Sequence, residues 1–248
     1  MKRKRYALPD ILRGLVLLSM LAYHTSWDMV YIFGQNWDWF KSNPAYIWQQ
    51  SICWSFILLS GFCWSFGRKK WKRGVTVFGA GVVISLVTLI FMPENRVLFG
   101  VLTLLGSSML FMLPLETVLR KVNPYIGLVC AFFLFLYAKD ISLGHLGWRK
   151  LGYITLPNEW YCNLFSAYLG LPADSFFSTD YFGIFPWFFL FVTGYFIYRV
   201  FEKKQWMDLL KVGSVKPLEI LGKNSLLVYM VHQPLVYGVL MVVYGVMG

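Results

Sequence analysis

The chain has 248 residues, and 58% of them are hydrophobic, which is more than the core of a soluble domain of this length needs. Apolar runs of about 20 residues recur along it, which excludes a soluble globular protein and predicts membrane-spanning helices. The formal net charge of +11 comes from short basic clusters between these runs, so it indicates membrane topology rather than nucleic-acid binding. The four cysteines lack metal-ligand spacing, and we expect neither a metal site nor a disulfide framework.

Seven apolar segments are predicted to cross the membrane as one all-α, polytopic helical bundle, which we expect to be a single domain over residues 1–248. The segments are residues 11–33, 46–66, 75–92, 97–115, 125–138, 182–201 and 221–244. The fifth is short for a full crossing, so we expect it to be tilted, extended by residues 122–124, or partly re-entrant.

Lysine and arginine are distributed unevenly among the connecting segments, and this asymmetry predicts the orientation of the chain. On the side of the N-terminus they occupy residues 2–5, 68–73, 120–121 and 199–223. The connecting segments of the other side carry Lys41, Arg96, Lys139, Arg149 and Lys150. We therefore expect the N-terminus inside and the C-terminus outside. The long outer loop, residues 139–181, is typical of a lid or binding element, and residues 157–168 are predicted to form a short interfacial helix.

The first span carries four ionisable residues, Asp10, Arg13, His24 and Asp28. At about 100° per residue, all four fall on one stripe of a continuous helix. Ionisable side chains inside a span are costly, and they normally face the protein interior and mark function. We therefore interpret the stripe as a polar line that runs from one membrane face towards the other.

Two pairs within this stripe suggest chemistry. His24 and Asp28 are four residues apart, so the carboxylate can orient the imidazole as a general base. The structural alternative is a histidine that hydrogen-bonds a neighbouring helix. Asp10 and Arg13 can form an ion pair near the inner face. That pair either sets the topology or presents Arg13 to a phosphate or carboxyl group that enters from the inside.

The densest basic cluster is GRKKWKRG, residues 67–74, which includes Arg68, Lys69 and Lys70. Such a cluster attracts anionic lipid head groups, and it equally suits a phosphorylated cofactor such as coenzyme A. The chain has no P-loop and no GxGxxG motif, so nothing predicts a nucleotide-binding fold.

Two further segments combine polar and aromatic residues. In the last span, Ser225, Tyr229 and His232 lie within about 60° of one another, and the following Gln233–Pro234 pair disturbs the helix. This patch is either functional or a purely structural polar cluster. Before the sixth span, Asp180 and Tyr181 are followed by further aromatic residues, and this pattern is typical of an interfacial belt or of a site for a sugar or an amine.

The ordered motifs of the chain resemble a known family. The motifs are PDILRG, His24 with Trp27 and Asp28, SGFCWSFGRKK, FGVLTLLGSSMLF, DYFGIFPWF and GKNSLLVYMVHQP. Together they resemble the bacterial relatives of heparan-alpha-glucosaminide N-acetyltransferase over residues 6–238. The resemblance implies acetyl transfer from cytosolic acetyl-CoA, through the membrane, to an amino or hydroxyl group of a sugar outside. It places the catalytic role on His24, with Arg13 on the cofactor side and Asp180 on the acceptor side.

The sequence as a whole predicts a multi-pass acyltransferase of the plasma membrane, with acetyl-CoA as donor and a glycan or amino sugar as acceptor. The expected catalytic residues are His24 and Asp28, and the expected donor-binding residues are Asp10, Arg13, Arg68, Lys69 and Lys70. The expected acceptor-binding residues are Trp27, Asp180, Tyr181, Asn224, Ser225, His232 and Gln233. His24 would act either as a base or as a transient acetyl carrier. A transporter or channel, and a non-catalytic scaffold, remain the alternatives, and no oligomeric state is indicated.

Overall fold

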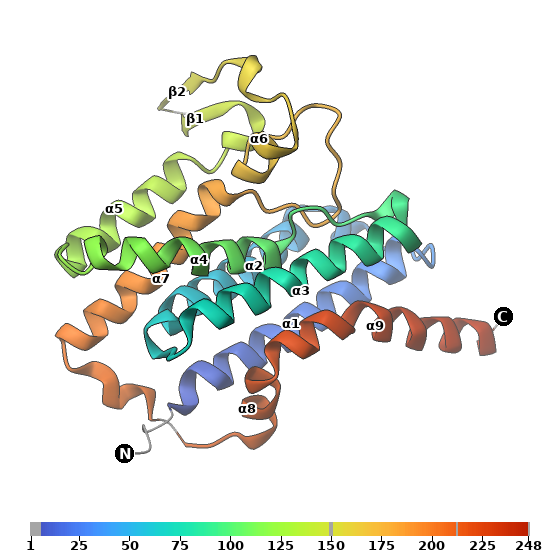
Figure 1. Ribbon diagram of the computed structural model, residues 1–248. Helices are drawn as coiled ribbons and strands as arrows, with labels where there is room; N and C mark the ends of the chain where they lie inside the picture. Colours follow the sequence, from blue (N-terminus) through green and yellow to red (C-terminus); the bar gives the residue numbers. More distant parts are fainter. Residues whose placement is uncertain (1–5, 149–150, 212, 248) are drawn as a thin grey trace. The chain divides into compact units, whose positions relative to one another are not determined.

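The computed structural model describes residues 6–148, 151–211 and 213–247, and it divides the chain into two compact units (Figure 1). Unit 1 combines the chain up to Phe56 with the chain from Gln205 onward, and unit 2 is Ile57–Lys204. The basic residues 2–5 and the outer-loop residues 149–150 lie outside the described residues.

Six helices in the described ranges are long and apolar enough to cross a membrane, which confirms an all-α, multi-pass bundle. They are α1 (Ala7–Tyr31), α3 (Lys70–Phe91), α4 (Val101–Leu119), α5 (Pro124–Tyr137, extended by a turn to Leu143), α7 (Ile184–Lys203) and α9 (Ser225–Met247). The span expected at residues 46–66 corresponds to α2 (Asn43–Phe62) and the 3-10 turn η2 (Cys63–Phe66). Helix α2 is long enough to cross, but Gln49 and Gln50 make it less apolar than the other six.

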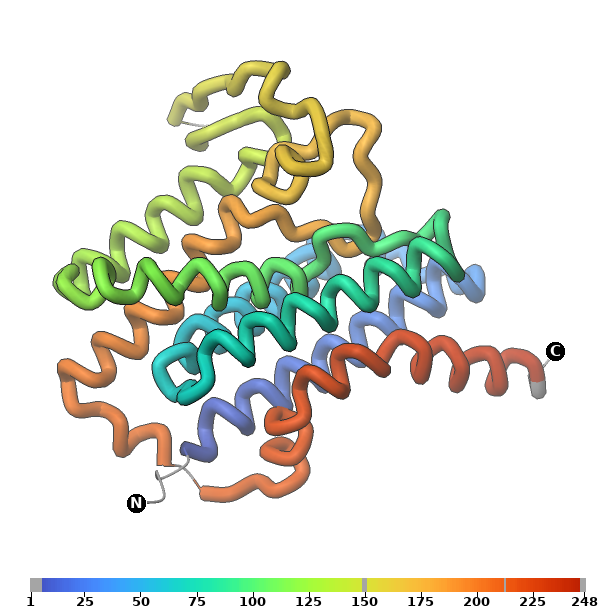
Figure 2. The backbone as a smooth tube through the Cα atoms, in the orientation of Figure 1, coloured from blue at the N-terminus to red at the C-terminus, as the bar shows by residue number. Residues whose placement is uncertain are grey.

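Unit 1 is organised around α1, which runs unbroken for 25 residues as expected (Figures 1 and 2). Its other elements are η1 (Asp38–Lys41), the first part of α2, η6 (Trp206–Leu210), α8 (Lys216–Lys223) and α9. The last expected span, residues 221–244, is therefore two helices rather than one. The break falls at Asn224, whose backbone leaves the helical conformation and whose amide donates to the Ile220 carbonyl.

Helices α1 and α8 pack backbone against backbone at two glycines. A Cβ atom built on Gly222 would lie 1.8 Å from the carbonyl oxygen of Asp10, and one built on Gly14 would lie 2.2 Å from that of Leu218. Only glycine permits these approaches without displacing a helix. The contact fixes α8 against the first half of α1, so the start of α9 is held near α1 as well.

The far end of α1 in unit 1 is enclosed by aromatic residues. Val30, Phe40 and Ala45 are buried together, and their partly buried neighbours are Tyr23, Trp27, Trp37 and Trp48. The indole nitrogen of Trp48 donates to the Ser19 hydroxyl at 2.8 Å, so α2 is tied to α1. This cluster covers the helix segment that carries His24 and Asp28.

Unit 2 is a bundle of the remaining long helices, and close backbone approaches hold it together. A Cβ on Gly61 would meet the Phe191 carbonyl oxygen at 1.9 Å, and one on Gly194 would meet the Leu58 oxygen at 2.2 Å. These contacts pack the end of α2 against α7. The other packed pairs are α3 with α4 and α5 with α7, which are neighbours in Figure 1.

A buried carboxylate ties several elements at one end of unit 2. Glu116 of α4 accepts hydrogen bonds from the Trp64 indole at 3.2 Å, from the Lys70 ammonium at 2.5 Å and from the Arg120 guanidinium at 2.8 Å. In addition, Arg199 of α7 donates to the Arg120 carbonyl. The basic segments around residues 68–73, 120–121 and 199–204 therefore gather at the same end of the unit, as the expected orientation requires.

The opposite end of unit 2 carries the loop between α5 and α7. Its elements are η4 (Ile141–Leu143), β1 (His145–Trp148), β2 (Gly152–Thr155), η5 (Asn158–Trp160) and α6 (Leu164–Leu169). A separate short turn, η3 (Pro93–Asn95), connects α3 to α4. The strands form an antiparallel hairpin in which His145 pairs with Thr155. The helix expected at residues 157–168 is shorter than predicted, because the Asn163 side chain caps α6 in a capping box.

Candidate active site

A polar cluster in unit 1 joins α1 to α9. Asp28 is fully buried, and its Oδ1 accepts a hydrogen bond of 2.8 Å from the Gln233 amide. The rings of His24 and His232 face each other with centroids 4.8 Å apart and planes inclined by 58°. The structure thus brings together the polar residues of the first and the last spans, which the sequence placed at opposite ends of the chain.

Three buried atoms of this cluster have no hydrogen-bond partner in the part of the chain that the structure describes. They are Asp28 Oδ2, His232 Nε2 and Gln233 Oε1. His232 Nδ1 faces the Tyr229 carbonyl oxygen, so Nδ1 carries the ring proton and Nε2 offers a lone pair. All three unpaired atoms are therefore acceptors, and a ligand group with several N–H or O–H donors matches them.

The partner of Asp28 differs from the expected one. The carboxylate was predicted to orient His24 on the same helix, but its described hydrogen bond goes to Gln233 of α9. His24 instead packs edge-on against Tyr23, with ring centroids 5.9 Å apart, and against His232. The two groups remain on one helix face, four residues apart, but the imidazole is positioned by its ring contacts.

The polar line along α1 is interrupted. Leu17 and Met20 are buried, at 0% and 4% exposure, and they lie on this side of α1 between Arg13 and His24. At about 100° per residue, Leu17 falls about 20° from Asp10, so it belongs to the same stripe. The expectation of a continuous polar path is therefore wrong, although the helix itself is continuous. The ionisable residues form two separate groups.

The inner group is the ion pair that the spacing predicted. Arg13 Nη1 lies 3.4 Å from Asp10 Oδ1, and the Asp10 side chain is almost fully buried. The Asp10 carbonyl is also the atom that approaches Gly222 of α8. The pair thus lies where α1 and α8 are packed most closely, and Arg13 is partly exposed beside it.

Three other expected site residues of unit 1 take part in local structure. Trp27 belongs to the aromatic cluster and stacks obliquely near Tyr31, with centroids 5.1 Å apart. Asn224 ends α8, and Ser225 begins α9. A direct role for these three in binding an acceptor stays a prediction.

The remaining expected residues belong to unit 2. Lys70 pairs with Glu116, whereas Arg68 and Lys69 are exposed. Asp180 Oδ2 accepts from the Val101 amide at 3.4 Å, at the start of α4, whose N-cap residue is a glycine without a side chain. Tyr181 donates to the Ala167 carbonyl, and burial raises the pKa of this phenol. Asp180 and Tyr181 thus hold the outer loop in place.

Two features of the structure are not indicated by the motifs and spacings of the sequence. One is the meeting of His24 with His232, which depends on tertiary packing. The other is Glu116, a lone acidic residue in an apolar run, and this isolation was a signal available in the sequence.

Comparison with protein families matches most of the chain to one family model. The family model described as "Heparan-alpha-glucosaminide N-acetyltransferase, catalytic" matches residues 5–234. This range includes His24, Asp28, His232 and Gln233 of the polar cluster, all of unit 2 and most of unit 1. Searches of curated proteins and of solved structures each found no match.

Proposed function

Because the chain belongs to the heparan-alpha-glucosaminide N-acetyltransferase catalytic family, we propose that it moves an acetyl group across a membrane. The donor is acetyl-CoA on the cytosolic side, and the acceptor is an amino or hydroxyl group of a sugar on the other side. The membrane is the plasma membrane. The multi-pass fold supports this proposal, since a membrane-embedded site is needed to join a donor and an acceptor that never share a compartment.

The observation that carries the proposal is the set of three unpaired acceptors at Asp28, His232 and Gln233. A sugar hydroxyl or amino group brings the donors that these atoms lack. Buried polar atoms without partners are rare in inert packing, because each one lowers stability by roughly 1–3 kcal/mol. A site that binds a donor-rich acceptor accounts for that cost.

The proposed chemistry uses His24 at the reacting centre. When bound, acetyl-CoA supplies the thioester carbonyl. His24 takes the proton of the acceptor N–H or O–H while the new bond to the acetyl carbon forms. The carbon–sulfur bond then breaks, and the leaving thiolate takes up the proton that His24 removed from the acceptor. In the alternative route His24 carries the acetyl group first and passes it to the acceptor. Asp28 and His232 hold the acceptor in either route.

The donor side is assigned to the cations of the inner face. In unit 1, Arg13 is partly exposed beside Asp10, and in unit 2, Arg68 and Lys69 are exposed, so each of these cations by itself suits a phosphate group of the donor. Lys70 is a weaker candidate because Glu116 already neutralises its charge. Leu17 and Met20 separate Arg13 from His24, so acetyl transfer along this face requires these side chains to move.

The test uses inverted membrane vesicles with acetyl-labelled acetyl-CoA outside and glucosamine inside. We expect label on the sugar with the unaltered protein and its loss with His24→Ala. His145→Ala is the matched control, because His145 lies in the hairpin of unit 2 and should leave the transfer unchanged. Intact thioester with the unaltered protein, together with release of unmodified glucosamine from the vesicles, would establish the transporter instead.

A second measurement separates the two routes. Incubation with labelled acetyl-CoA and no acceptor should leave label on the protein only if His24 carries the acetyl group. Peptide mapping then locates the label. Its absence, with transfer intact when the acceptor is added, assigns His24 the role of base.

A further inference from the structure

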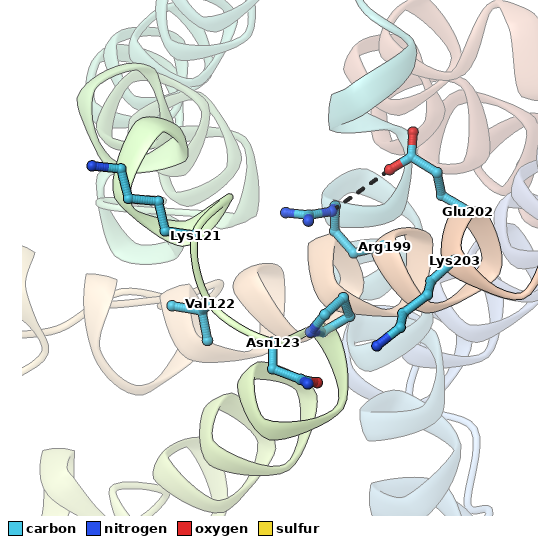
Figure 3. A pocket seen from close by; sticks show the side chains of 7 residues that line it. Lys121, Val122, Asn123, Arg199, Glu202 and Lys203 are labelled. Atoms are coloured by element: carbon cyan, nitrogen blue, oxygen red, sulfur yellow. Dashed lines mark ion pairs between the residues drawn. The ribbon is translucent and has the colours of Figure 1, made fainter.

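Unit 2 contains a pocket of about 450 Å³ at the end where its basic segments gather (Figure 3). It lies between the turn that joins α4 to α5 and the last turns of α7. The lining residues are Lys121, Val122, Asn123, Pro124, Arg199, Glu202 and Lys203. Figure 3 shows Arg199 and Lys203 extending from α7 on one side of the pocket, opposite the turn that carries Val122 and Asn123.

The charges around the pocket favour an anion. Arg199 is held by the Tyr195 hydroxyl and the Arg120 carbonyl, and its Nε lies 3.6 Å from Glu202. Lys121 and Lys203 have no carboxylate partner within the described ranges, although Lys203 lies 4.9 Å from the ring centroid of Tyr125. The lining therefore includes three cations and one carboxylate, so it carries a net positive charge.

The start of α5 adds to this preference. Asn123 caps the helix and Pro124 occupies its first turn, so the positive end of the 14-residue helix lies at the pocket. A helix end alone would be weak support. Here it coincides with Lys121 and Lys203, for which the described residues supply no carboxylate partner, and with the cavity itself.

An apolar surface continues from the pocket along α5. Ile126, Val129 and Phe133 are 60%, 67% and 50% exposed, and they fall within about 60° on one helix face. In a membrane this face lies against hydrocarbon. A molecule that fills both features has an anionic head and an alkyl chain.

We propose that this pocket binds the phosphate of an anionic phospholipid, with one acyl chain lying along the Ile126–Val129–Phe133 face of α5. Basic pockets between membrane helices recognise such head groups by charge and by hydrogen bonds. The inference does not depend on the acetyltransferase proposal, because none of the pocket residues belongs to the polar cluster of unit 1 or to the assigned donor residues.

The test measures lipid binding to the full-length protein in phosphatidylcholine nanodiscs that contain increasing fractions of phosphatidylglycerol. We expect preferential retention of phosphatidylglycerol in native mass spectra. The double variant Lys121→Gln/Lys203→Gln should lower its apparent affinity about 25-fold, at about fivefold for each lysine. Lys203→Arg should retain binding, because it keeps the charge.

The matched control is Lys72→Gln/Lys204→Gln, which removes the same charge from exposed lysines that do not line the pocket. A loss equal to that of the pocket variant would mean general surface attraction and overturn the proposal. A further arm adds coenzyme A or inorganic phosphate at saturating concentration. Displacement of phosphatidylglycerol by either would assign the pocket to a soluble phosphate group and would also overturn it.

Discussion

The two units each contain a buried carboxylate, and the two carboxylates differ in how many of their oxygens are hydrogen-bonded. Glu116 in unit 2 has both oxygens engaged, by an indole, an ammonium and a guanidinium from three elements. Asp28 in unit 1 has one oxygen bonded to Gln233, and the other has no partner among the described residues. A buried carboxylate with all its partners acts as a structural tie, whereas one with an unmet oxygen is suited to a ligand. Glu116 is therefore assigned a structural role, and Asp28 is assigned to the proposed acceptor site.

The largest expected effect concerns the satisfied carboxylate. Glu116→Ala should lower the free energy of unfolding by about 3 kcal/mol, because it leaves the Lys70 ammonium and the Trp64 indole without their acceptor. Thermal unfolding in detergent measures this loss. Glu202→Gln is the control, since its 57% exposed side chain forms a surface ion pair with Arg199 and a long hydrogen bond from Tyr198, and the change should alter stability by less than about 1 kcal/mol. Equal losses of unfolding free energy in the two variants would contradict the structural role of Glu116.

Asp28→Asn should leave stability almost unchanged and lower acetyl transfer. It keeps the size of the side chain and the possibility of a hydrogen bond to Gln233, so unfolding should change by less than about 1 kcal/mol. Acetyl transfer should fall about 100-fold, because the charge that holds the acceptor is lost. Initial rates with labelled acetyl-CoA measure the effect. A variant as active as the unaltered protein would contradict the assignment of Asp28 to the site.

Gly222→Ala sharpens the comparison within unit 1. The added methyl group would overlap the Asp10 carbonyl of α1, so we expect a loss of about 1–3 kcal/mol in stability as α8 shifts. Transfer should also weaken, since α8 precedes the helix that carries His232. Gly79→Ala is the control, because a Cβ there meets nothing within 4 Å and the change suits a helix. Denaturant titration of both variants distinguishes the steric overlap with the Asp10 carbonyl from a general effect of replacing glycine by alanine.

The smallest expected effect concerns Asp180. Its carboxylate accepts from the first amide of α4, so Asp180→Ala should lower stability by about 1 kcal/mol through loss of a helix cap. The KM for the sugar acceptor should stay unchanged. A raised KM with unaltered stability would instead give Asp180 the acceptor-binding role that the sequence suggested.

Much of the fold follows from hydrophobic patterning, because spans in lipid must be long, apolar and helical. The unbroken α1 and the gathering of basic segments at one end of unit 2 were predictable on that basis. The break at Asn224 was not, since the polar residues Lys223, Asn224 and Ser225 fit the entry to a single span equally well, and a local amide-to-carbonyl bond decides the geometry. Short elements of the outer loop, such as the β1–β2 hairpin, likewise depend on local turns.

The candidate site was predictable only in pieces. His24 and His232 each stood out as ionisable residues in a span, but their 4.8 Å ring contact depends on how α9 packs against α1. The prediction of a continuous polar line was wrong for a simpler reason. Buried Leu17 lies on the same stripe as the charged residues, and the helical period alone does not show which side chains lie between them.

Unit 1 is built from the two ends of the chain, and this has a consequence for the biogenesis of the protein. Helix α1 leaves the ribosome first, whereas α9, which carries His232 and Gln233 of the polar cluster, leaves it after all of unit 2 has been made. Until then the carboxylate of Asp28 lacks its Gln233 partner inside the bilayer. A nascent chain that stops before residue 233 would contain every helix of unit 2 and still lack the hydrogen-bond donor of Asp28.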